Sequence, residues 1–146
     1  MRKDRVVSKE FIKKLVDMTA SRELEWETIP EYFDSNKNEM LRKYIIALNK
    51  YYFKMLAIYK KWPSLDEYAS FCAKIHGGLV VVFCSTKDLN ERVYELGVQP
   101  NTDSLIHVET GKELAEDVSL LYDTIQNLET DVELFINEII GEEDTK

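Results

Sequence analysis

Hydrophobic positions near the N-terminus repeat first with the period of a helix and then with that of a strand. The apolar residues within 11–16 share one side of a helical wheel, and Ser8 before them is a common N-cap. This pattern predicts a helix that ends near residue 20. In residues 24–28 two glutamates alternate with larger, less polar side chains, which predicts a short strand that stops at Pro30.

The next part of the chain predicts a second helix followed by a strand. Residues 36–49 carry apolar side chains at helical spacing, and Asn36 and Glu39 fit a capping box, although a strand over 44–48 is the alternative. The helical face consists of Met40, Leu41, Tyr44, Ile45 and Leu48. Residues 51–59 place an apolar side chain at every second position, so a strand is predicted there.

The clearest hairpin signal is the sequence His76-Gly77-Gly78 between two runs that favour strands. Residues 67–75 and 79–84 are rich in aromatic and β-branched side chains. Glycine readily adopts the positive φ that a tight turn between antiparallel strands requires. The two runs are therefore predicted to pair.

Strands gathered in the middle of the chain and helices at its ends predict an α+β fold. Further strands are expected over residues 93–98 and 105–108. We expect a mostly antiparallel sheet of about 4–6 strands, with an N-terminal helix and a long C-terminal helix packed on it. One domain should span residues 1–146, with fraying at 1–7 and 142–146.

A long C-terminal helix is predicted over residues 110–140. Thr110 and Glu113 fit a capping box, and Gly141 is typical of a position just after a helix. The apolar residues repeat as a heptad, with β-branched residues at one seam position and mostly leucine at the other, which favours two-stranded coiled coils. The seam that would meet a second chain contains Val118, Leu121, Ile125, Leu128, Val132 and Phe135.

Two features favour packing of this helix on its own domain. Ile136 and Ile140 widen the apolar stripe beyond a narrow seam. The positions flanking the seam contain acids but no Lys or Arg to pair with them in a dimer. We therefore expect intramolecular packing, with dimerisation through the seam as the alternative. Both hold together if the C-terminal half of the helix projects from the domain.

Charge is distributed unevenly along this chain of 146 residues and net charge −8. Residues 37–61 contain seven Lys or Arg and one acid, whereas residues 113–144 contain eleven acids and no base. An acidic run is usually a solvated helix face, and the alternative is a surface that meets a basic partner. The residues assigned to that candidate surface are Glu116, Asp123, Glu129, Asp131 and Glu133.

The sequence contains no motif for catalysis, a cofactor or a metal ion. Cys72 and Cys84 lie within apolar runs and should be buried, and neither His76 nor His107 is placed to activate them. The Cys and His spacings fit no zinc pattern, and a glycine-rich phosphate loop is missing. We expect a protein that is not an enzyme and that uses no cofactor and no metal.

The apolar runs indicate a cytoplasmic protein that does not enter a membrane. Residues 1–7 are charged with no apolar leader segment after them, and the longest apolar run, 79–84, is far shorter than the ~20 residues of a membrane span. Net acidity disfavours nucleic acid as a partner. Lysines and aromatic residues interleave within residues 50–62, however, which keeps a single-stranded nucleic-acid site as an alternative.

The N-terminal pattern resembles that of a loose group of small Firmicutes proteins, often encoded near prophages or other mobile elements. The matching residues are Phe11, Leu15 and Thr19, then Leu24-Glu25-Trp26, and the hairpin at Gly77-Gly78-Leu79 fits the same layout. Arg22 stands where such proteins often have glycine. The resemblance implies a bacterial or phage accessory protein and transfers no catalytic or binding residue.

Together these features predict a non-enzymatic protein-binding accessory protein. Its specific form would be a small acidic inhibitor of a DNA-handling or defence protein, acting through the acidic face of the C-terminal helix. One alternative is a homodimeric scaffold protein built on the heptad seam. The other is a single-stranded nucleic-acid binder that uses residues 50–62.

Overall fold

The computed structural model describes residues 7–59, 63–87, 91–109, 112–128 and 131–144, and it shows an α+β fold. Its six-stranded antiparallel sheet has the order β1-β3-β4-β5-β6, with β2 paired to β4. The strands are β1 (Trp26–Thr28), β2 (Ser64–Leu65), β3 (Phe71–Ile75), β4 (Gly78–Lys87), β5 (Glu91–Gln99) and β6 (His107–Glu109). The helices are α1 (Lys9–Ala20), α2 (Ile29–Ser35), α3 (Glu39–Tyr59), α4 (Ala115–Gln126) and α5 (Asp131–Asp144). The predicted fold class is confirmed.

Strand β4 is buried on both of its faces, which explains its unbroken apolar run. Val80, Val82 and Cys84 point to one side of the sheet, whereas Val81 and Phe83 point to the other. Side chains alternate across a strand, so a strand that is covered on both faces needs apolar residues at every position. Helices must therefore cover both faces of the sheet.

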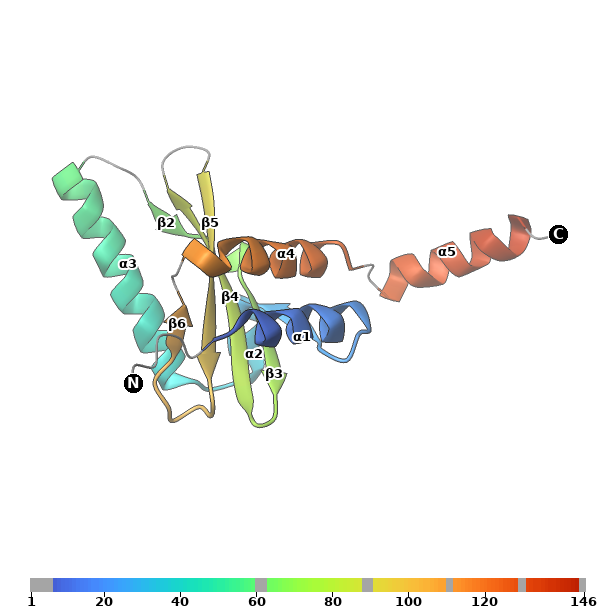
Figure 1. Ribbon diagram of the computed structural model, residues 1–146, viewed down its shortest axis with the longest axis horizontal. Helices are drawn as coiled ribbons and strands as arrows, with labels where there is room; N and C mark the ends of the chain where they lie inside the picture. The colour runs from blue at the N-terminus through green and yellow to red at the C-terminus, as the bar shows by residue number, and fades with distance from the viewer. Residues whose placement is uncertain (1–6, 60–62, 88–90, 110–111, 129–130, 145–146) are drawn as a thin grey trace.

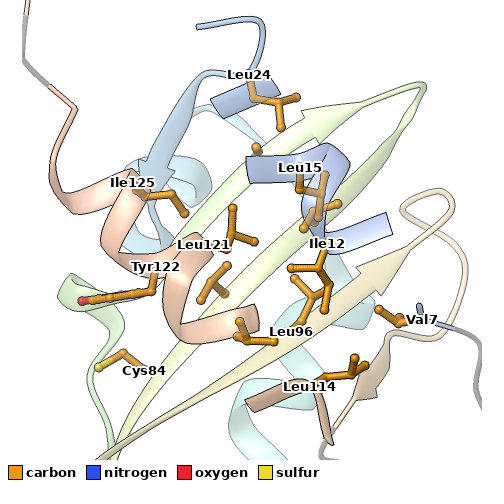
Figure 2. Close-up of a cluster of buried hydrophobic side chains, with 14 residues drawn as sticks. Val7, Ile12, Leu15, Leu24, Cys84, Leu96, Leu114, Leu121, Tyr122 and Ile125 are labelled. Atoms are coloured by element: carbon orange, nitrogen blue, oxygen red, sulfur yellow. The ribbon is translucent and has the colours of Figure 1, made fainter. Parts of the chain in front are cut away.

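Helices α1 and α4 cover the first face. Figure 1 shows them side by side on one side of the sheet, and Figure 2 shows Ile12 and Leu15 of α1 beside Leu121 and Ile125 of α4. Val7, which we expected in a frayed end, is buried in the same cluster. The N-terminal helix and the first part of the C-terminal helix thus pack on the sheet as predicted.

Helices α2 and α3 cover the second face, which the sequence prediction left open. Ile29 of α2 and Leu41 of α3 are buried there with Phe83. Asn38 Oδ1 accepts a hydrogen bond from the Leu41 backbone N–H at 3.0 Å and caps α3, so the predicted Asn36–Glu39 capping box is wrong. The Asn38 side chain is also paired with that of Gln99, which ties the start of α3 to the end of β5.

The predicted hairpin is confirmed in its turn and its pairing. Ile75 lies opposite Gly78, so His76 and Gly77 form a two-residue loop between β3 and β4. Both have positive φ, 49° and 78°, as a type I′ turn requires. The strands expected near 24–28, 93–98 and 105–108 are present as β1, β5 and β6.

The strand predicted over residues 51–59 is wrong. These residues continue α3, so the helix predicted over 36–49 is confirmed from Glu39 onward but is too short at its end, and the alternative strand over 44–48 is excluded. The alternating apolar residues resemble a strand because α3 leaves the aromatic residues Tyr51 and Phe53 exposed to solvent. Tyr52 between them is half-buried, and its hydroxyl donates a hydrogen bond to Ser85 Oγ.

The long C-terminal helix is interrupted. Helix α4 ends at Gln126 with Asn127 as its C-cap, and α5 begins at Asp131, so residues 110–140 are not a single rod. Gly141 lies inside α5 and does not end it. The Thr110 capping position and the residues 60–62 after α3 lie outside the described residues.

Candidate functional site

Helix α5 carries an apolar stripe that the rest of the domain does not cover. Figure 1 shows α5 extending beyond the end of α4, away from the sheet. The stripe follows helical spacing along α5 and is exposed throughout. It consists of Val132, Phe135, Ile136, Ile139 and Ile140, which are 67%, 63%, 47%, 43% and 50% exposed. We call these five residues the α5 stripe.

The predicted dimer seam is therefore divided between two environments. Val118, Leu121 and Ile125 on α4 are buried against α1 and the sheet, and Leu128 is half-buried. The remaining seam residues, Val132 and Phe135, belong to the exposed α5 stripe. The first half of the heptad is core, and only the second half is available to another molecule.

The acidic residues assigned to a partner surface are divided in the same way. Glu116 and Asp123 are exposed on α4, and Glu133 is exposed on α5. Asp131 begins α5, and Glu129 lies outside the described residues. A single acidic rod that could imitate the charge of a nucleic acid is thus absent from the described residues. The acids of 131–144, six in number with no base, remain on one helix.

A second exposed apolar surface lies on α3 and overlaps the segment 50–62, in which the sequence predicts an alternative nucleic-acid site. Ile46, Asn49, Lys50, Phe53 and Lys54 line an open groove of about 490 Å³ on this helix. We call these five residues the α3 groove. Phe53 is its most exposed apolar residue at 73%. The strand prediction hid the groove, because only helical geometry brings residues three and four positions apart onto one face.

The α3 groove contains two lysines and lies on a basic helix. Helix α3 contains four Lys or Arg and one acid. No carboxylate of the described residues forms an ion pair with Lys50 or Lys54. Arg42 is engaged elsewhere, since its guanidinium lies 4.4 Å from the centre of the Phe33 ring. The two lysines of the groove are thus available to an acidic partner.

The candidate nucleophiles are held in unreactive environments. Cys72 and Cys84 are buried, and burial raises the pKa of both thiols above the ordinary value of 9.0. A raised pKa disfavours the thiolate, which is the nucleophilic form of cysteine. Of the two histidines, His76 is exposed in the β3–β4 turn. His107 lies on β6, with its Nε2 atom 3.7 Å from Oε1 of Glu109.

Within the described parts of the chain, the His, Cys, Asp and Glu side chains form no group that could hold a metal ion. No described helix is both long enough and apolar enough to cross a membrane. Comparison with protein-family models, with curated proteins and with solved structures finds no match for the chain.

Proposed function

We propose that this chain is a non-enzymatic protein-binding protein whose recognition element is helix α5. The observation that supports this most directly is the α5 stripe, in which five large apolar side chains are exposed on one helix. An isolated exposed Ile or Phe is ordinary, but contiguous apolar residues rimmed by charge are typical of interaction surfaces. An amphipathic helix with such a stripe suits a hydrophobic groove on another protein.

The charge of α5 favours a protein partner over a membrane. Residues 131–144 contain six acids and no base. Helices that bind membrane surfaces carry basic residues on their polar face, because lipid headgroups are often anionic. The acids around the α5 stripe would instead favour a groove with basic edges, where opposite charges raise the association rate and the specificity.

Site-specific photo-crosslinking tests this proposal. We would replace Phe135 by p-benzoylphenylalanine and irradiate cells that produce the full chain. The matched control places the same group at Asn137, which is also exposed on α5 but lies outside the stripe. We expect a discrete protein adduct from position 135 and little from position 137. No adduct at 135, or equal adducts at both positions, would contradict the proposal.

A further inference from the structure

The α5 stripe and the α3 groove, two exposed apolar surfaces of the described residues, are complementary in charge. The α5 stripe lies on a helix with six acids and no base, and the α3 groove lies on a helix with four bases and one acid. Each has large apolar side chains at its centre, with Phe135 and Phe53 the most exposed aromatic residue of each. Opposite charges around apolar centres are the arrangement expected of two surfaces that bind each other.

The lengths of the two surfaces also agree. From Val132 to Ile140 the α5 stripe covers about 12 Å at the rise of an α-helix. From Ile46 to Lys54 the α3 groove also covers about 12 Å. The full α5 stripe can therefore lie along α3.

One chain does not bring these surfaces together. Figure 1 shows α3 on one side of the sheet and α5 projecting beyond the opposite side. We propose that α5 of one copy docks in the α3 groove of a second copy, with its acids near Lys50 and Lys54. Reciprocal docking closes a two-fold dimer in which each copy provides one helix and one groove. This inference rests on the proposed role of α5 and names its partner.

The proposed contact differs from pairing of α5 with α5. Two α5 helices would bring acids against acids, so salt would screen a repulsion and strengthen that dimer. Docking of α5 on α3 joins opposite charges, so salt would weaken it. The direction of the salt effect separates the two arrangements.

Sedimentation equilibrium of the full chain and two variants tests the inference. Phe135→Glu damages the α5 stripe but leaves the groove intact, and Phe53→Glu does the reverse. Asn137→Glu and Tyr51→Glu are the matched controls. Each adds the same charge at an exposed position of the same helix, but outside the α5 stripe and the α3 groove. Circular dichroism and thermal unfolding would verify that all four variants keep the fold.

We expect the unmodified chain to sediment as a dimer, at twice its mass of 17.1 kDa. The dissociation constant of this dimer should rise at least tenfold at high salt. Each groove or stripe variant alone should be a monomer, and the two controls should remain dimers. An equimolar mixture of Phe135→Glu and Phe53→Glu should recover a weaker 1:1 complex, because one intact helix and one intact groove remain.

Several results would overturn the inference. If Phe53→Glu remains a dimer, or if salt tightens the dimer, α5 pairs with α5, and the proposed function survives without the α3 groove. If the unmodified chain is a monomer, the inference fails. If a different protein then crosslinks at position 135, the proposed function of α5 still holds. If no adduct forms there, both the proposed function and the dimer inference are wrong. A monomer that binds single-stranded oligonucleotide through Lys50 and Lys54 would assign the groove to nucleic acid.

Discussion

The indole Nε1 of Trp26 donates a hydrogen bond to Thr19 Oγ1 at 3.0 Å, and that hydroxyl donates in turn to the Leu15 carbonyl at 2.6 Å. The three residues join the end of α1 to the start of β1. They belong to the N-terminal sequence pattern of Phe11, Leu15, Thr19 and Trp26, so that pattern forms a structural corner.

We expect Thr19→Val to lower the free energy of unfolding by about 1–2 kcal/mol. The change keeps the shape of a fully buried side chain but removes the acceptor for Trp26, and an unsatisfied polar group costs about this much. Thr19→Ser is the control, because it keeps the hydroxyl. Urea unfolding followed by tryptophan fluorescence measures both. Equal losses in the two variants would show that packing of the methyl group matters more than the bond.

Arg22, in the same corner, has φ of 64°, a conformation that glycine adopts without strain. We expect Arg22→Gly to be more stable than Arg22→Ala by about 1 kcal/mol, since both remove the side chain but only glycine relieves the backbone. Thermal unfolding of the two variants measures the difference. A more stable alanine variant would mean that the left-handed conformation is not kept in solution.

The N-terminus of α2 should make stability depend on pH in the acid range. The Glu31 carboxylate accepts a hydrogen bond from the Thr28 backbone N–H at 2.8 Å, and this bond, with one from the Thr28 side chain, lowers the pKa of Glu31 below 4.5. Because the folded pKa is lowered, the stabilisation is present above pH 4.5 and is lost as the pH falls through the folded value.

An NMR titration of the Glu31 side chain should therefore show a midpoint below 4.5. In Glu31→Gln the capping geometry can persist without a titrating group, so the acid loss of stability should become smaller. A Glu31 midpoint at or above 4.5 would rule out the carboxylate as the cap.

The sequence correctly predicted those helices and strands in which the apolar residues are buried and repeat with the period of the element. The hairpin at His76-Gly77 and the covered strand β4 were predictable because turn residues and apolar runs mark them directly. Helix α2 was missed, although Thr28-Ile29-Pro30-Glu31 contains both a capping box and a proline in the first turn. The same residues also carry the signal for the end of a strand, because Pro30 follows the alternating residues 24–28.

The two surfaces of the candidate site were harder to predict, because each breaks the rule that apolar residues are buried. Phe53 is an apolar residue on the exposed side of α3. It therefore adds to a run of apolar residues at every second position, which is the pattern of a strand. The heptad continues from α4 into α5 and conceals the end of α4 at Gln126. The sequence Thr130-Asp131-Val132-Glu133 fits a capping box and was the available sign of a new helix start.

The most direct test of the central claim compares lysine at two valines of the same heptad position. Val118 is 2% exposed on α4 and Val132 is 67% exposed on α5. In dilute solution, where association contributes little, we expect Val118→Lys to lower the free energy of unfolding by about 4 kcal/mol or more and Val132→Lys to change it by less than about 0.5 kcal/mol. Urea unfolding curves of the two variants give both values. Similar losses at the two positions would show that α5 is packed in the domain and is not an exposed recognition helix.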